Sequence, residues 1–134
     1  MLFVLHFAVT WFLIGLSWFV LGVHYPLFQE VPKELFKNYS SLHQAKTTSL
    51  VLFPLFFEAL SAVLIVLFYP LQPLFLLSTL FLAFVWVTTL FAFRCHQKLE
   101  RRKTQKVLDR LMQIHLLRTF LWTARGGILI ALFS

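Results

Sequence analysis

Apolar residues dominate four long stretches of the chain, and polar or charged residues gather between them. The stretches run from Leu2 to Tyr25, Thr47 to Tyr69, Leu71 to Phe93 and Leu111 to Phe133. Each is close to the roughly 20 residues that an α-helix needs to cross the hydrocarbon core of a bilayer. The pattern therefore predicts a single all-α transmembrane domain over residues 1–134, with helices over about 2–25, 47–69, 71–97 and 108–133.

The polar segments predict how these helices are joined. The sequence YPLQP over residues 69–73 predicts a tight turn, because proline removes a backbone donor and disfavours helical geometry at the preceding residue. The second and third helices then form an antiparallel hairpin. In the first connection, PKELFKNY over residues 32–39 has the pattern of a short amphipathic interfacial helix. The expected fold is an integral membrane four-helix up-down bundle, with this short interfacial helix between helices one and two.

The charged residues predict the orientation in the membrane. The chain is 60% hydrophobic and has 12 basic against 5 acidic residues, for a net charge of +7. Three lysines lie in the first connection and seven basic residues lie in residues 94–110, whereas the chain ends and the 69–73 turn carry none. The positive-inside rule then places both termini outside and both long connections in the cytoplasm, against anionic lipid headgroups. We expect a bacterial inner-membrane protein and no nucleic-acid partner.

Four histidines are expected at one end of the bundle. His24 ends helix one, His43 precedes helix two, His96 ends helix three and His115 begins helix four, so all four lie on the cytoplasmic side. Imidazoles from facing helices build metal and haem sites in helical bundles. A second interpretation stays open, since polar residues also collect at helix ends where water begins. Cys95 is the only cysteine, which excludes an internal disulfide.

Three charged residues lie inside the apolar stretches. On helix four, Arg118 and Arg125 share a stripe with His115 and Trp122, and Glu58 is the only carboxylate within any predicted span. A charge at this depth is costly unless it faces the bundle interior and finds a partner. We expect Glu58 to pair with Arg125 or Arg118, to bind a cation or to handle protons. A structural ion pair that specifies helix register is the alternative.

Aromatic residues near these charges are expected to line a pocket, and they are Trp11, Trp18, Tyr25, Trp86 and Trp122. Gly15 and Gly22 fall near the same face of helix one as Trp18 and Tyr25. Because glycine has no side chain, these two positions predict a close approach of a neighbouring helix.

Four segments together are similar to a recurring bacterial group of small four-helix membrane proteins, which resembles the anthrone-oxygenase-like family: GVHYPLFQEVPKELFKNYSSLHQAKT, FFEAL, RCHQKL and LLRTFLWTARG. The resemblance covers nearly the whole chain. The final helix of that family often has an Asn-Trp-x-Arg-Thr type of segment, and His115 stands here in place of the asparagine. The resemblance implies a site made of His24, Tyr25, His43, Glu58, His96, Arg118, Trp122 and Arg125. LHFAVTWFLIGL also resembles the first helix of the short four-helix membrane protoporphyrinogen oxidase, which binds haem.

Together these observations predict a membrane-embedded, metal- or haem-dependent oxidoreductase or monooxygenase that acts on an apolar small molecule. Iron, copper or haem b is the expected cofactor. Two alternatives stay open: a carrier or assembly subunit without chemistry, and a small proton-coupled transporter that uses Glu58. The pattern is also compatible with a homo-oligomer.

Each candidate residue has an expected role. The expected metal ligands are His24, His43 and His96, with His115 as an optional fourth. The expected catalytic residues are Glu58, Arg118, Arg125 and Tyr25, and the residues expected to contact the cofactor are Trp18, Trp86 and Trp122.

Overall fold

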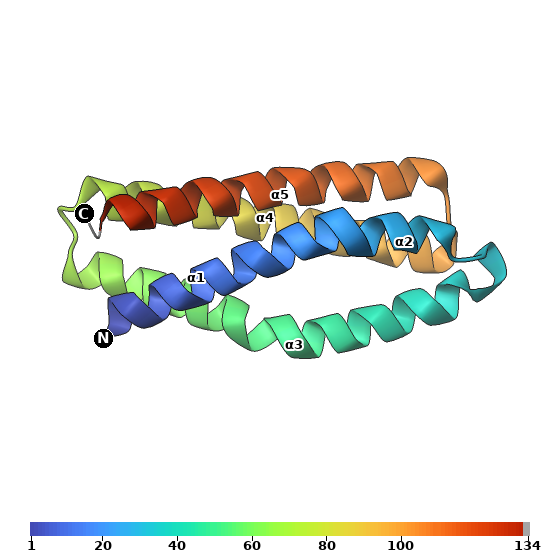
Figure 1. The fold of residues 1–134 in the computed structure, drawn as a ribbon, viewed down its shortest axis with the longest axis horizontal. Coiled ribbons are helices and arrows are strands. Elements are labelled where there is room, and N and C mark those ends of the chain that lie inside the picture. Colours follow the sequence, from blue (N-terminus) through green and yellow to red (C-terminus); the bar gives the residue numbers. More distant parts are fainter. Residues whose placement is uncertain (133–134) are drawn as a thin grey trace.

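A computed structural model describes residues 1–132, and within this range the chain is helical, without a strand (Figure 1). The elements in chain order are α1 (Leu2–Phe19), the π-helical segment η1 (Val20–His24), α2 (Tyr25–Glu30), α3 (Lys33–Phe68), α4 (Pro73–Arg101) and α5 (Gln105–Ala131). Because α1, η1 and α2 follow one another without a break, the described residues make up four long helical rods.

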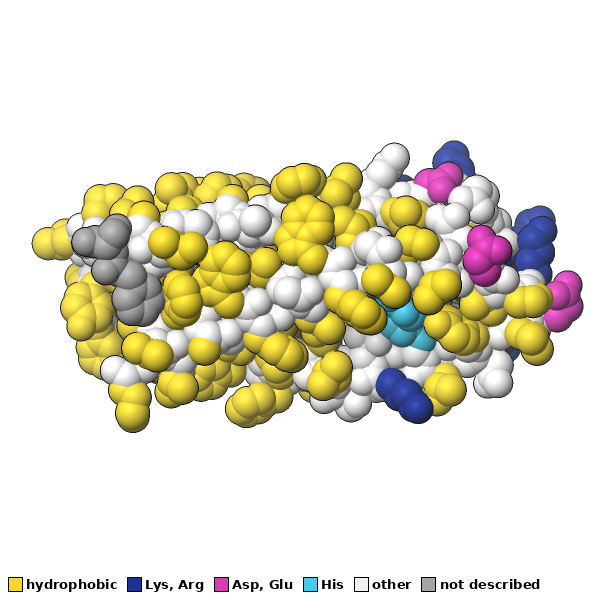
Figure 2. Space-filling view, in the orientation of Figure 1, with side chains coloured by type: hydrophobic (Ala, Val, Ile, Leu, Met, Phe, Trp, Pro, Cys, Tyr) yellow, Lys and Arg dark blue, Asp and Glu magenta, His cyan; other side chains and the backbone are white. Residues whose placement is uncertain are grey.

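Three of these rods are long and apolar enough to cross a membrane, namely Leu2–Glu30, Lys33–Phe68 and Pro73–Arg101. Histidine and arginine side chains within α5 lower its hydropathy, so α5 lies outside this set. Large hydrophobic side chains cover most of the visible surface, and the charged side chains gather at one end (Figure 2). This distribution is that of a membrane protein with one charged end.

The first connection differs from its prediction. Residues 32–39 do not form a separate interfacial helix, because Lys33 begins the 36-residue helix α3. The break lies earlier, at Val31, whose extended backbone is the conformation that a following proline favours. At about 1.5 Å per residue, α3 is roughly 54 Å long, which exceeds the roughly 30 Å of hydrocarbon in a bilayer. Its first turns therefore extend the helix beyond the apolar layer.

The second connection agrees with its prediction. The amide of Gln72 donates to the carbonyl of Tyr69 across 3.2 Å, which closes a turn, and Pro73 begins α4. Proline suits a first helical position because its missing donor has no partner there. At the third connection, α4 ends at Arg101, later than the predicted residue 97, and α5 begins at Gln105, earlier than the predicted residue 108. The predicted end of the last helix at residue 133 lies outside the described residues.

Consecutive rods run in opposite directions along the molecule (Figure 1). The beginning of α1 and the end of α5 lie at the same end as the turn between α3 and α4 (Figure 1). Two buried clusters fill the interior. One joins Tyr25 and Phe28 to the end of α4, and the other joins Leu13 to Trp122. The space between the two clusters contains the candidate site.

The close helix approach lies on α5 and not on α1. A Cβ atom added at Gly15 or Gly22 would meet no atom within 4 Å, so the prediction for these glycines is wrong. A Cβ atom at Gly126 would lie 2.6 Å from Cδ1 of Ile14. Gly126 therefore allows α5 to approach α1 closely.

Candidate functional site

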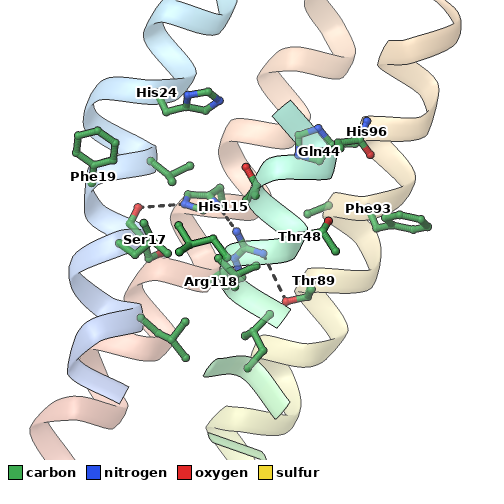
Figure 3. A pocket seen from close by; sticks show the side chains of 18 of the residues that line it. Ser17, Phe19, His24, Gln44, Thr48, Thr89, Phe93, His96, His115 and Arg118 are labelled. Carbon is green, nitrogen blue, oxygen red and sulfur yellow. Dashed lines mark hydrogen bonds between the residues drawn. The ribbon is translucent and has the colours of Figure 1, made fainter. Parts of the chain in front are cut away.

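A cavity of about 340 Å³ lies among the helices, and all four predicted histidines line it. Figure 3 shows His24, His96 and His115 around this cavity. His24 comes from the end of η1, His43 from α3, His96 from α4 and His115 from α5. The structure thus brings one imidazole from each rod to a single cavity, at the end of the bundle where the sequence predicted them. Their role as ligands stays a prediction.

Three of these imidazoles lie near one another. The rings of His24 and His43 are stacked, with centroids 4.1 Å apart and planes inclined by 20°. The centroid of His96 lies 6.0 Å from that of His43. The Tyr25 hydroxyl lies 3.5 Å from Nε2 of His96, within reach of a weak hydrogen bond. His24, His43, His96 and Tyr25 therefore form a mixed cluster of proton donors and acceptors.

His115 has both of its ring nitrogens in use. Nε2 lies 3.1 Å from the carbonyl oxygen of Ser17, which can only accept, so Nε2 carries the proton. Nδ1 then accepts from a guanidinium NH₂ group of Arg118, the i+3 residue on α5. These two contacts define a neutral imidazole of one tautomer. In this arrangement His115 has no nitrogen left for a metal, and its role is to orient Arg118.

Arg118 faces the cavity without a carboxylate partner. Besides His115, its guanidinium reaches the Thr89 hydroxyl at 3.5 Å and lies 5.5 Å from the ring centroid of Trp122. Among the described residues, the one ion pair is that of Arg125 with Glu58. Arg118 therefore presents an uncompensated positive charge to the cavity.

Buried polar atoms without partners also point to this cavity. Among the described residues, Trp86 Nε1, outside the cavity, is a buried nitrogen without a hydrogen bond, and three more belong to His24 (Nε2), His96 (Nδ1) and Arg118 (Nε). Each such atom needs an explanation, because leaving a buried polar group unpaired costs about 1–3 kcal/mol. All three residues line the same cavity. A bound molecule with hydrogen-bonding atoms would satisfy them together.

Within residues 1–132, no group of three or more histidine, cysteine, aspartate or glutamate side chains is placed to hold a metal ion. The stacking of His24 on His43 explains this result in part, because stacked rings direct their nitrogen lone pairs side by side and not toward a common point. Haem ligation by this pair meets the same obstacle, since two axial imidazoles lie on opposite faces of the porphyrin. A metal or haem centre would require these side chains to rearrange.

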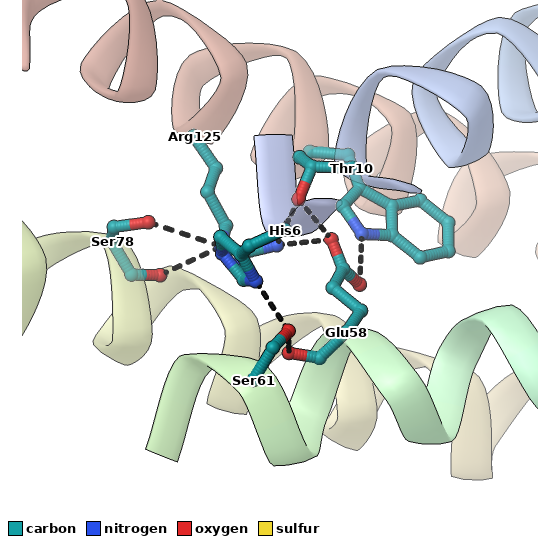
Figure 4. A network of polar contacts seen from close by, with 7 residues as sticks. His6, Thr10, Glu58, Ser61, Ser78 and Arg125 are labelled. Carbon is teal, nitrogen blue, oxygen red and sulfur yellow. Dashed lines mark hydrogen bonds and ion pairs between the residues drawn. The ribbon is translucent and has the colours of Figure 1, made fainter. Parts of the chain in front are cut away.

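A second polar cluster lies nearer the other end of the bundle, around Glu58 and Arg125 (Figure 4). Both side chains are fully buried and form an ion pair. Glu58 also accepts hydrogen bonds from the Thr10 hydroxyl at 2.9 Å and from the Trp122 indole at 3.1 Å. Nε of Arg125 donates to the carbonyl and hydroxyl oxygens of Ser78, each at 3.1 Å. Of the two pairings left open by the sequence, the structure has Glu58 with Arg125.

His6 also belongs to this second cluster, although it is not among the site residues predicted from the sequence. Its Nε2 accepts from Arg125 at 2.7 Å, so Nδ1 carries the proton and donates to the Ser61 hydroxyl at 2.6 Å. His6 lies near the chain end, away from the four histidines that share one layer. A signal was nevertheless present, since His6, Thr10 and Ser17 are spaced as one polar stripe on an apolar helix.

Two of the three tryptophans expected at the cofactor lie elsewhere. Trp122 lines the cavity, whereas Trp18 and Trp86 do not. The indole of Trp18 is 42% exposed and donates to Thr123 on α5. Trp86 packs on Phe56 with ring centroids 5.6 Å apart. Neither indole therefore lines the cavity, since Trp18 lies at the surface and Trp86 packs against the cluster of Leu13 and Trp122.

Comparisons of the chain with protein families, with curated proteins and with solved structures find no match.

Proposed function

We propose that the protein is a membrane-embedded oxidoreductase that binds an apolar, oxygen-bearing small molecule in the cavity between Arg118 and the histidine cluster. One observation carries the proposal: a guanidinium without a carboxylate partner, together with unpaired nitrogens of His24 and His96, lines a largely apolar cavity.

The head of the substrate is an anionic or electron-rich oxygen. A charged side chain within a membrane domain is costly unless a partner compensates it, and Arg118 finds no such partner within the described chain. Glu58 cannot serve, because Arg125, Thr10 and Trp122 already bind it. A phenolate, an enolate or a carboxylate would accept charge-assisted hydrogen bonds from Arg118.

The body of the substrate is apolar and reaches the cavity from the bilayer. Apolar side chains such as Leu13, Val51 and Leu55 form much of the cavity wall. Phe19 and Phe93 also line it, although they are 58% and 55% exposed on the outer surface. Since the wall of the cavity is continuous with the lipid-facing surface at these residues, a lipid-soluble molecule can enter from the side.

The chemistry we propose is removal of a proton followed by oxidation. A neutral imidazole of the cluster takes a proton from an acidic O–H or C–H group, and Arg118 stabilises the anion that forms. The resemblance to the anthrone-oxygenase-like family favours dioxygen as the oxidant. In that reaction a CH₂ group flanked by aromatic rings and one molecule of O₂ give a carbonyl group and water.

A metal or haem cofactor stays part of the proposal as a variant. His24, His43 and His96 would be the ligands of iron, copper or haem b, after the stacked rings separate. His115 is not proposed as a ligand, because both of its nitrogens are bound within the protein. Iron or copper in the purified protein, or a Soret band in its spectrum, would support this variant.

The arrangement in the cell completes the proposal. We infer an up-down bundle in the bacterial inner membrane with both termini outside, since the basic residues lie in the two long connections. The histidine cavity then lies toward the cytoplasmic face. A transporter that uses Glu58 is less favoured, because the pairing of Glu58 with Arg125 would have to break in every cycle.

The test uses anthrone, a tricyclic ketone that can form an enolate, and anthracene, which has the same ring system without oxygen. Quenching of tryptophan fluorescence reports binding to the purified protein, since Trp122 lines the cavity. Arg118→Gln should weaken anthrone binding by about tenfold or more, because a hydrogen bond to a charged group contributes about 1.5–3 kcal/mol. Anthracene binding should not change.

Arg94→Gln is the matched control, because Arg94 is an exposed arginine of α4 that does not line the cavity. It should bind anthrone as the wild type does. Equal losses in Arg94→Gln and Arg118→Gln would contradict the assignment of Arg118. Oxygen uptake with anthrone, measured with an oxygen electrode, then separates enzyme from carrier: binding without uptake would favour the carrier.

A further inference from the structure

A second cavity, of about 760 Å³, lies at the end of the molecule that carries the two long connections. Its wall comes from the end of α2, the start of α3, the end of α4 and the start of α5. It contains five cationic side chains, which are Lys33, Lys37, Arg101, Arg102 and Lys103. Figure 2 shows lysine and arginine side chains gathered at this end, together with acidic and hydrophobic side chains. We call this space the basic cavity.

Lys103 fixes one wall of the basic cavity. Its ammonium group donates to the carbonyl oxygens of Gln29 and Val31 at 2.7 and 2.6 Å, at the C-terminal end of α2. It also lies 4.9 Å from the ring centroid of Phe36. These contacts hold the α4–α5 connection against α2 and α3. Because an ammonium group has three donors, one stays free for a ligand.

The cations of the basic cavity outnumber its carboxylates. Among the described residues, no carboxylate forms a salt bridge with Lys33, Lys37, Arg101 or Arg102. Glu100 also lines the cavity, where its carboxylate accepts from the neutral amide of Gln44 at 2.6 Å, so five cations and one carboxylate leave the wall with a net charge of +4. Like charges around one concave surface repel each other and attract an anion. The basic cavity therefore has the charge and the size for an anionic ligand.

We propose that the basic cavity binds the phosphate group of an anionic phospholipid. Phosphate is the chemistry that arginine side chains recognise best, since a guanidinium can donate two parallel hydrogen bonds to it. The position of the cavity favours a lipid over a soluble phosphate. Leu35, Tyr39 and Leu42 are exposed and share one stripe of α3, on a different side of the helix from Lys33 and Lys37. Apolar surface for acyl chains therefore reaches the level of the cavity. The proposal is independent of the chemistry in the histidine cavity.

The test measures the thermal unfolding of the detergent-solubilised protein after addition of dioleoylphosphatidylglycerol, dioleoylphosphatidylcholine or inorganic phosphate. We expect phosphatidylglycerol to raise the Tm and the other two additions to have little effect. The double variant R101Q/R102Q should lose at least half of this rise. The control is K106Q/R110Q, which removes the same charge from exposed positions outside the basic cavity and should keep the rise.

K33Q/K37Q provides a second test on the part of the wall formed by α3, and it should lose the rise as R101Q/R102Q does. Equal losses in R101Q/R102Q and K106Q/R110Q would show diffuse attraction to net charge and overturn the proposal. A rise of the same size with inorganic phosphate would assign the cavity to a soluble anion and overturn the lipid assignment. The absence of any rise with phosphatidylglycerol in the wild type would also overturn it.

Discussion

The two arginines of α5 lie seven residues apart on one stripe and yet have different partners. Arg125 is fully buried and pairs with Glu58, and its remaining donors reach His6, Thr10 and Ser78. Arg118 has hydroxyl, imidazole and aromatic neighbours but no carboxylate. We therefore assign Arg125 to the stability of the bundle and Arg118 to the ligand.

The ion pair gives a prediction at the residue scale. Glu58→Gln or Arg125→Gln alone should destabilise the protein by about 3–5 kcal/mol, because each leaves an unpaired buried charge. The double variant should cost less than the sum of the two single changes. Unfolding of the three variants in detergent measures this coupling, and strictly additive effects would contradict the pairing.

The two arginines should also differ in how much each contributes to the free energy of unfolding. Arg118→Gln should change the unfolding free energy less than Arg125→Gln does, because it removes a charge that has no ionic partner within the described chain. Both variants are compared in the same unfolding experiment. A larger loss of stability in Arg118→Gln than in Arg125→Gln would reverse our assignment.

At the scale of elements, one glycine allows α5 to approach α1 closely at Ile14 and Trp11. A side chain at Gly126 would collide with Ile14 and approach Trp11, whereas Gly127 has no atom within 4 Å of the corresponding position. Gly126→Leu should therefore destabilise the protein by about 1–3 kcal/mol, the usual cost of overpacking. Gly127→Leu makes the same chemical change on the open side and should be close to neutral. Equal unfolding temperatures for the two variants would contradict this helix contact.

At the scale of the whole molecule, the distribution of charge predicts the orientation. In a Cys95→Ala background, a membrane-impermeant maleimide should label Leu71→Cys in intact cells, because that turn faces outward in the proposed topology. Gln105→Cys should react only after the membrane is permeabilised. Leu71 is 93% exposed and Gln105 is also exposed, so access to the side chain does not limit either reaction. Labelling of Gln105→Cys in intact cells would invert the topology.

The sequence by itself determined the helices and the layer of histidines. Runs of apolar residues specify helices of membrane-spanning length, and Pro70 and Pro73 specify the turn between two of them. Consecutive helices run in opposite directions, so the end of one helix lies beside the start of the next. The positions of His24, His43, His96 and His115 at such ends were therefore enough to place them in one layer. Such features depend on local composition and on connectivity alone. The start of α3 is the exception, since no local signal separates residues 32–39 from the helix that follows.

Only the tertiary structure decided which side chains meet, because this depends on how far each helix rotates about its own axis when it packs. Glu58 had two arginines within reach by depth, and rotation brought Arg125 to it together with His6. The same rotations turned Trp18 toward the surface and Trp122 toward the cavity. They also bound both nitrogens of His115 within the protein, whereas His24 and His96 each keep an unpaired nitrogen. A helical stripe fixes which residues share a face, but only packing fixes what that face contacts.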